Sequence, residues 1–237
     1  MSTIIRLDNV DFGNKDLPVI PRLVSGDICF SYKPSIKNGF VDHSGVGTIA
    51  TQIGEPILKD IGLYCGTENG YRTVEDDVDE ITAIVVFAED IDDSNGADFM
   101  PIGNYNVDNG TGWGLFYRSG TIKGIAYANT GSARQAAQLG VLSGQWACIR
   151  VSKTRMSLFV AENGVLTETY SDADFVDRSK TPSDTIGIGA AARSTWPVAK
   201  EIVAEATMYK RALSDAEIQK AYEYSKAYFN KHTSLDI

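Results

Sequence analysis

The sequence is poor in the side chains on which most enzyme and metal chemistry depends. Its 237 residues include two histidines, His43 and His232, and three cysteines. Imidazole is the usual base near neutral pH, so this scarcity argues against most hydrolase mechanisms. The cysteines are odd in number and form no CxxC pair, which argues against a zinc or redox site. We expect Cys29, Cys65 and Cys148 to be small buried side chains; the alternatives are a Cys29–Cys65 bridge or a reactive thiol.

Long apolar segments are also missing. No apolar run approaches the roughly 20 residues that cross a bilayer, and Met1–Asp11 lacks the basic start and continuous apolar core of a signal peptide. We therefore expect no membrane partner and no export by the general route. The net charge of −9 disfavours nucleic acid as a partner, because phosphate would be repelled.

Basic residues are absent from one long segment. Between Arg72 and Arg118 there is no Lys or Arg but eleven Asp and Glu, so this segment accounts for the net negative charge. The acids flank Ile81–Ala88, an apolar, β-branched run typical of a strand buried on both faces. The acidic loops indicate either ordinary solvation of a charged surface or a cation site.

Calcium is the cation that such loops would hold, because it prefers carboxylate oxygens. Asp90, Asp92 and Asp98 are the candidate ligands. The segment is not an EF-hand, since counting from Asp90 the sixth position is Asn95 and the twelfth is Pro101. We expect no required cofactor and treat calcium as an optional ligand.

The rest of the chain reads as an all-β domain that ends in one helix. Short apolar segments recur between Gly and Asn turns, which predicts an antiparallel sandwich. Ser214 and Glu217 form a capping box, with Leu213 and Ile218 as its apolar staple, and an apolar stripe follows at helical spacing over Asp215–Asn230. The expected strands are 27–32, 62–65, 71–74, 81–88, 100–103, 113–118, 123–128, 146–152, 156–161, 185–188 and 202–208.

Four segments carry a resemblance to a known family. They are Asp42–Gly47 (DHSGVG), Ile81–Ala88, Gly144–Val151 (GQWACIRV) and the ending Ala204–Ile218 with its KRALSDAEI. In this order they resemble the laminin-G-like or concanavalin A-like lectin jelly roll. The chain departs from the family in two places: Phe87 stands near the usual Trp, and Ala204-Glu205-Ala206 replaces an Asp-Glu pair, which weakens any family-type metal position there.

The resemblance implies a two-sheet antiparallel jelly-roll sandwich over residues 21–237, with the C-terminal amphipathic helix at 215–230. Residues 1–20 fall outside it, and their opening resembles the attachment arm of some phage structural proteins. We therefore expect a virion protein, made in the host cytoplasm, whose arm contacts other virion proteins. Because virion fibres are commonly trimers, a homo-oligomer is expected, with a trimer as the first choice.

Sugar binding by such folds needs an exposed aromatic platform and polar groups on rim loops, because a pyranose offers an apolar face and a ring of hydroxyls. Trp196, with Arg193 as a hydrogen-bond donor, is the first candidate, and Tyr105 is the second. Trp113 and Trp146 lie in predicted strands, so we expect them in the core.

Two catalytic interpretations are weaker. Glycoside cleavage needs two facing carboxylates, but Glu89–Asp93 lacks the final Glu of the glucanase motif and follows the strand instead of lying in it. Asp42-His43-Ser44 contains triad residue types, but neighbours in sequence cannot meet end to end, so a turn is the better account. We expect no catalytic residues.

The sequence thus predicts a non-enzymatic phage virion binding module of the tail-fibre or receptor-binding type, which would recognise host surface polysaccharide. Two alternatives stay open. One is a capsid or tail decoration protein that uses the sandwich for protein contacts, and the other is a polysaccharide-degrading enzyme.

Overall fold

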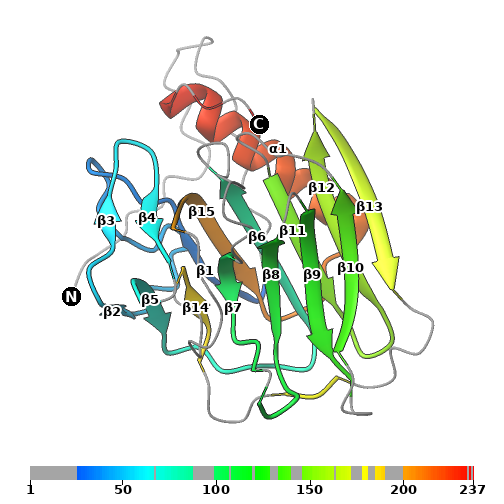
Figure 1. Ribbon diagram of the computed structural model, residues 1–237. Coiled ribbons are helices and arrows are strands. Elements are labelled where there is room, and N and C mark those ends of the chain that lie inside the picture. The colour runs from blue at the N-terminus through cyan, green and yellow to red at the C-terminus, as the bar shows by residue number, and fades with distance from the viewer. Residues whose placement is uncertain are drawn as a thin grey trace.

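A computed structural model describes most of the chain from Gly26 onward. The described residues are 26–66, 68–87, 99–106, 108–118, 121–128, 133–139, 146–162, 164–171, 178–180, 185–189, 200–233, 235 and 237. They form fifteen strands and one helix (Figure 1). The predicted arm at 1–20 lies outside them. The described part contains no helix long and apolar enough to cross a bilayer.

The strands form two antiparallel sheets. Sheet A has eight strands, in the spatial order β13 (Val165–Ser171), β12 (Met156–Glu162), β11 (Trp146–Val151), β6 (Ile81–Phe87), β15 (Glu201–Tyr209), β4 (Leu63–Cys65) and β3 (Ile57–Leu58), with β1 (Ile28–Tyr32) also paired to β15. Sheet C has seven, in the order β10 (Ala133–Leu139), β9 (Thr121–Tyr127), β8 (Trp113–Arg118), β7 (Phe99–Gly103), β14 (Gly187–Ile188), β5 (Gly70–Thr73) and β2 (Ala50–Ile53).

Strand β15 is the longest strand and organises one half of sheet A. Its one side pairs with β6. Its other side is shared, because β4 pairs with Glu201–Val203 and β1 pairs with Ala206–Tyr209. A register shift between Val203 and Glu205 marks a bulge at the point where the two partners change.

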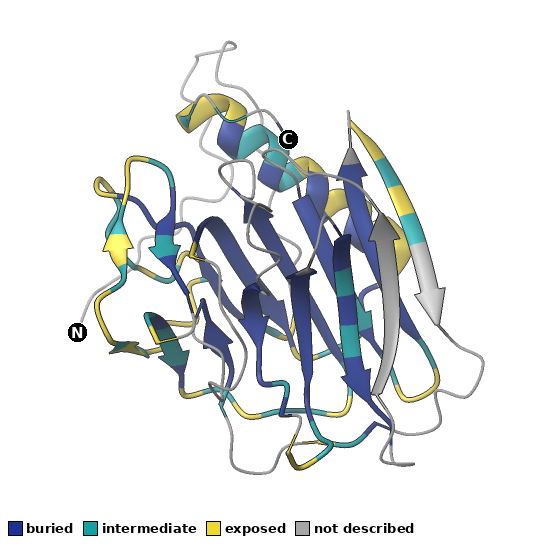
Figure 2. Ribbon diagram, in the orientation of Figure 1, coloured by how far each residue is buried: buried dark blue, intermediate teal, exposed yellow. Residues whose placement is uncertain are grey.

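The main core lies between the two sheets. Alternate residues of β6 and β15 point into it, together with Trp113 and Ile122 from sheet C, and all of these side chains are fully buried. Every residue of β6 is buried, as its sequence predicted (Figure 2). The opposite face of β6 is therefore also covered, and sheet A needs a layer on each side.

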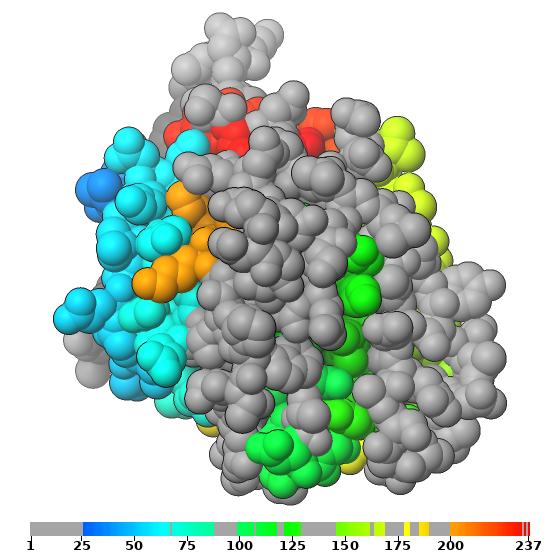
Figure 3. Space-filling model, in the orientation of Figure 1, coloured from blue at the N-terminus to red at the C-terminus, as the bar shows by residue number. Residues whose placement is uncertain are grey.

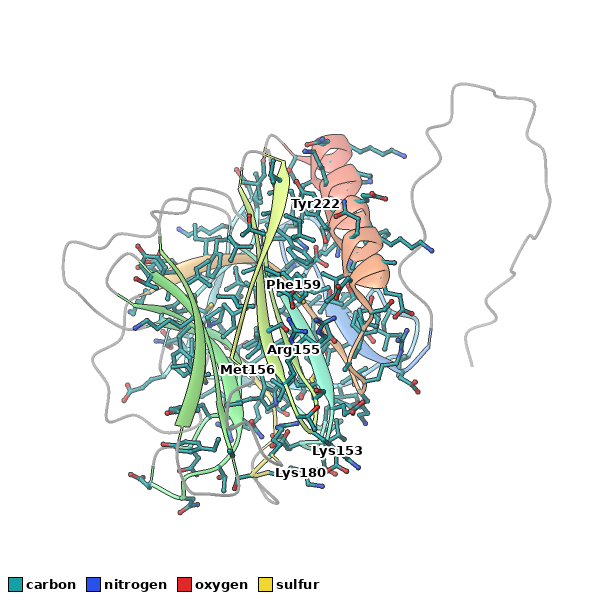
Figure 4. All side chains as sticks on the ribbon, turned by 90° about the vertical axis from the view of Figure 1, so that its right-hand side faces the viewer. Lys153, Arg155, Met156, Phe159, Lys180 and Tyr222 are labelled. Carbon is teal, nitrogen blue, oxygen red and sulfur yellow. The ribbon has the colours of Figure 1, made fainter. Side chains whose placement is uncertain are left out.

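The helix α1 (Asp215–His232) provides that second layer. Trp146, Phe159 and Ile84 on the outer face of sheet A pack against Ile218 and Tyr222 of the helix in a second buried cluster. Figure 4 shows Tyr222 on the side of α1 that faces the sheet and Phe159 on the strand beside it. The predicted layers, sheet on sheet with a C-terminal helix, are confirmed.

The capping box predicted at the start of α1 is present. The Ser214 hydroxyl accepts a hydrogen bond from the Glu217 amide, and the Glu217 carboxylate accepts one from the Ser214 amide at 2.9 Å. Arg211 adds a bidentate contact to Glu217, at 2.9 and 2.7 Å. This guanidinium, followed by the Ser214 amide, lowers the pKa of Glu217 to about 2. The helix ends at His232, two residues beyond the prediction.

Four observed strands were not predicted: β2, β3, β10 and β13. They are the first and last strands of the two spatial orders, so all four are sheet edges. An edge strand pairs on one side only and is less buried, so its sequence is less apolar. Strand β10 reads ARQAAQL and β13 reads VLTETYS, and neither shows the apolar run of an interior strand.

The turn at Asp42 has the form that its sequence predicted. One carboxylate oxygen of Asp42 accepts hydrogen bonds from the amides of Ser31 and Ser44, at 2.8 and 2.9 Å. The other accepts from the Ser44 hydroxyl and from the amides of Gly47 and Thr48. Gly45 and Gly47 have φ of 83° and 80°, which other residues rarely adopt. No triad is formed, and the carboxylate ties the loop to β1.

The three cysteines are free and buried, as expected, so the alternative Cys29–Cys65 bridge is wrong. Trp113 and Trp146 are fully buried in the two cores, also as expected.

We expect Asp42→Asn to destabilise the fold by about 2–3 kcal/mol at pH 7, because amide donors would face a group with one acceptor oxygen fewer. Burial raises the pKa of Asp42, but its hydrogen bonds outweigh that effect and hold it below the usual value. The carboxylate therefore stabilises the fold above the unfolded-state pKa near 4, and this contribution is lost as the pH falls through the lower folded value. Urea unfolding at pH 7 and pH 3 measures the loss of stability and its pH dependence. The variant Asp76→Asn, at an exposed position, is the control. An equal pH dependence in Asp42→Asn and wild type would contradict the assignment.

We expect Ser214→Ala to cost about 1 kcal/mol, because the first turn of α1 loses its cap. Thermal unfolding followed by circular dichroism measures the loss. Lys220→Ala changes an exposed position of α1 and leaves the cap intact, so it is the control. An unchanged stability in Ser214→Ala would show that the cap is not needed to hold the helix on the sheet.

Candidate functional site

A polar pocket lies beside the C-terminal end of α1. Its volume is about 80 Å³, and we call it the helix pocket. It is lined by residues of the loop Lys33–Asn38, by Asp60, Ile61 and Ala204, and by residues of the last turn of α1 between Tyr228 and Thr233. These segments are far apart in sequence, but β1, β4 and β15 are neighbours in sheet A and bring them together (Figure 1).

A buried ion pair lies at the inner side of the helix pocket. The ammonium of Lys33 lies 2.7 Å from the carboxylate of Glu205, and both side chains are 1% exposed. Lys33 follows directly after β1, and Glu205 lies on β15 next to the bulge. Burial lowers the pKa of Lys33, and the carboxylate of Glu205 opposes that fall. The charge of Lys33 is thus already matched within the protein.

Hydroxyl groups and aromatic rings complete the surroundings of this pair. The Thr207 hydroxyl donates to Glu205 at 2.8 Å and lies 2.8 Å from the Ser31 hydroxyl. On the helix side, the rings of Tyr224 and Tyr228 lie 5.0 and 5.2 Å from the Lys33 ammonium, within the range of cation–π attraction. The ion pair therefore fixes α1 over sheet A at the point where the apolar core between them ends.

The outer wall of the pocket presents polar groups that the fold does not use. Asp60 and Lys37 are exposed, and neither side chain has a hydrogen-bond or ion-pair partner among the described residues. The side-chain nitrogen Nδ2 of Asn38 donates to the Tyr228 hydroxyl at 2.9 Å and to the backbone carbonyl of Lys33 at 3.3 Å. The side-chain carbonyl oxygen of Asn38 is left to accept a hydrogen bond. The pocket thus offers hydrogen-bond donors and acceptors beside the aromatic side chains of Tyr228, Phe229 and His232.

Tyr105, a predicted ligand residue, lies in the loop after β7. Its ring stacks on Tyr127 at 4.9 Å and meets Phe116 edge-on at 5.2 Å, and the side chain is half-buried. Burial, followed by a hydrogen bond with Tyr127, raises the pKa of Tyr105. One ring face is therefore covered by the protein. The role of Tyr105 in sugar binding stays a prediction.

The other predicted ligand residues, Trp196 and Arg193, lie outside the described residues, as do the candidate calcium ligands Asp90, Asp92 and Asp98. Within the described part, no group of three or more His, Cys, Asp or Glu side chains is placed to hold a metal ion. Both site predictions remain untested.

The first acidic loop, Glu75–Glu80, is matched by bases from distant parts of the chain. Glu75 pairs with Lys210 at 2.6 Å, and Asp79 pairs with Lys180 at 2.6 Å. Asp77 pairs with Arg178, and both of these side chains are buried. The hydrogen bond from Lys180 lowers the pKa of Asp79, and Lys153 adds to this effect; Figure 4 places the two lysines near each other. These acids therefore tie the loop to residues outside the strands, at 178–180 and just after β15.

Sequence reasoning missed the helix pocket. A signal for part of it was present, because Glu205 interrupts the apolar strand sequence IVAEATM, and a carboxylate in a buried strand needs a partner. Nothing in the sequence identified Lys33 as that partner, since 172 positions separate the two residues.

No family model and no curated protein matches this sequence. Several solved structures are similar in fold. The receptor binding domain of botulinum neurotoxin D has a TM-score of 0.62 and 15% identity, over 84% of this chain and 53% of that one. The receptor binding domain of botulinum neurotoxin type G has a TM-score of 0.62 and 12% identity, over 85% of this chain and 52% of that one.

A third similar structure is the ligand binding domain of serotype D in complex with N-acetylneuraminic acid, with a TM-score of 0.60 and 15% identity, over 83% of this chain and 50% of that one. This chain spans about half the length of these domains. At such identity the likeness establishes a shared sandwich fold, as the sequence predicted. The laminin-G-like branch and the phage setting remain predictions.

The buried ion pair gives a direct test of the pocket's architecture. Lys33→Met leaves the Glu205 carboxylate buried without a counter-charge, and we expect a loss of about 3–5 kcal/mol. The double variant Lys33→Met/Glu205→Gln removes both charges, so it should be more stable than Lys33→Met alone. Urea unfolding of the wild type, both single variants and the double variant completes the cycle. Additive losses would show that the two side chains do not interact.

Proposed function

We propose that this chain is a non-enzymatic carbohydrate-binding module and that sugar binds in the helix pocket. The observation that carries the proposal is a set of polar groups that line the same pocket as Tyr228 and have no partner among the described residues, namely Asp60, Lys37 and the side-chain carbonyl of Asn38. A pyranose needs donors and acceptors for its hydroxyls and an aromatic surface for its apolar face. The pocket supplies donors and acceptors for the hydroxyls, and its aromatic lining residues Tyr228 and Phe229 add apolar surface to its wall.

The size of the pocket fits part of one sugar residue and not a chain. By the measure in which a water needs about 10–15 Å³, its 80 Å³ holds several waters, which is enough for one end of a sugar ring. The remainder of a longer glycan would extend over the surface around Lys37 and Asp60.

The acid content of the pocket supports recognition and not cleavage. Glycoside hydrolysis uses two carboxylates about 5–10 Å apart. Asp60 is the one acid among the described lining residues. The similarity in fold to receptor-binding domains, one of them in complex with N-acetylneuraminic acid, supports the same conclusion.

We further propose that the module acts on a virion, as a tail-fibre or receptor-binding component directed to host surface polysaccharide. The support is the resemblance of residues 1–20 to phage attachment arms. A small pocket gives weak binding per site, and a homo-oligomer, with a trimer as the first choice, would multiply it through avidity. A rival sugar site consists of Trp196, Arg193 and Tyr105. A calcium site would consist of Asp90, Asp92 and Asp98. The experiment below tests both.

The test is binding of the full chain to a glycan array and to bacterial cells, with and without calcium. We expect the wild type to bind, and Asp60→Ala to bind at least tenfold more weakly, because a hydrogen bond to a charged group is worth about 1.5–3 kcal/mol. Glu55→Ala is the matched control, since Glu55 is an exposed acid that does not line the pocket.

Three outcomes would contradict parts of the proposal. Wild-type protein that binds no glycan under any condition overturns the carbohydrate function and favours a decoration role. Binding lost in Trp196→Ala or Tyr105→Ala but kept in Asp60→Ala overturns the helix pocket. Binding lost only on calcium removal assigns the function to the acidic loops.

A further inference from the structure

The charges that face the helix pocket balance one another. On its inner side Lys33 is neutralised by Glu205 at 2.7 Å. On its outer side Lys37 and Asp60 carry one charge of each sign. His232 and Tyr228 are the remaining titratable lining groups, and their rings lie 4.8 Å apart.

A sugar carboxylate would find no dedicated receptor among these groups. Proteins bind carboxylates best with Arg, whose planar guanidinium donates two parallel hydrogen bonds, and no Arg lines the described pocket. The Lys33 ammonium is already committed to Glu205, and two tyrosine rings lie beside it.

Two features also oppose an added negative charge. The pocket is formed in part by the last turn of α1, and the C-terminal end of a helix carries a partial negative charge. Asp60 adds a full carboxylate at the rim, without a basic partner among the described residues. Both features favour hydroxyl groups, which donate hydrogen bonds to carboxylate and carbonyl oxygens.

We propose that the helix pocket binds a neutral, hydroxyl-rich sugar and discriminates against the same sugar bearing a carboxylate. The inference rests on the proposed function and makes it more specific. The hydroxyls of the sugar donate to Asp60 and to the Asn38 carbonyl, and Lys37 donates to a ring or hydroxyl oxygen. This preference for a neutral sugar would distinguish this chain from the similar domain in complex with N-acetylneuraminic acid, which is an acidic sugar.

The experiment compares methyl glycosides of glucose, galactose and mannose with the corresponding uronates, which differ only in a CH₂OH or COO⁻ group. Saturation-transfer NMR on the full chain measures each affinity. For any pair that binds, we expect the hexose to bind at least tenfold more tightly than its uronate, because Asp60 repels the added charge.

Two variants locate the discrimination. Asp60→Asn removes the carboxylate at the rim of the pocket, and we expect the preference for the hexose over its uronate to fall below about threefold. Lys37→Met removes the basic group among the exposed lining residues, and we expect the preference for the hexose over its uronate to widen. Glu55→Gln is the control and should keep the wild-type preference.

The outcomes separate this inference from the proposed function. Uronates that bind as tightly as hexoses overturn the discrimination and leave carbohydrate binding intact. A preference that Asp60→Asn does not change overturns its assignment to the pocket. Failure of every hexose, every uronate and the glycan array overturns the proposed function itself.

Discussion

The structure depends on one constraint: the central strands of sheet A are buried on both faces. Strand β6 is buried over its whole length, and β15 beside it is buried as well. One sheet cannot cover two faces, so sheet C packs on one side and α1 on the other. Figure 3 shows the C-terminal segment in red at the top of the molecule and the early strands in blue and cyan on the left. The capping box and the Arg211 contact set where this helix begins.

The helix pocket follows from the way this second layer ends. Beside the C-terminal half of α1 the apolar cluster is joined by Lys33 and Glu205, and the Lys33 ammonium lies against the rings of Tyr224 and Tyr228. A buried ion pair is tolerated only where both charges are matched. Beyond the pair, the loop after β1, Asp60 and the last turn of α1 line the helix pocket. The pocket therefore lies at the edge of the layer that α1 forms on sheet A.

Much of this fold was readable in the sequence because interior strands and capped helices carry strong local signals. Ile81–Ala88 indicated a doubly buried strand, and Ser214 with Glu217 indicated a helix start. The edge strands were missed because their stability comes from pairing with a neighbour and not from an apolar run. The pocket was missed for a related reason. The pocket joins the loop after β1 to the end of α1, and local sequence does not report contacts between segments so far apart in the chain.

The central claim, that carbohydrate binds in the helix pocket, can be tested directly because the chain has two histidines and one of them lines the pocket. Histidine-selective NMR of the full chain during titration with a glycan that binds it would follow both imidazoles. The account predicts that the signals of His232 shift to saturation with the glycan while those of His43 stay in place. Saturation of the protein with glycan while the His232 signals remain unchanged would contradict it.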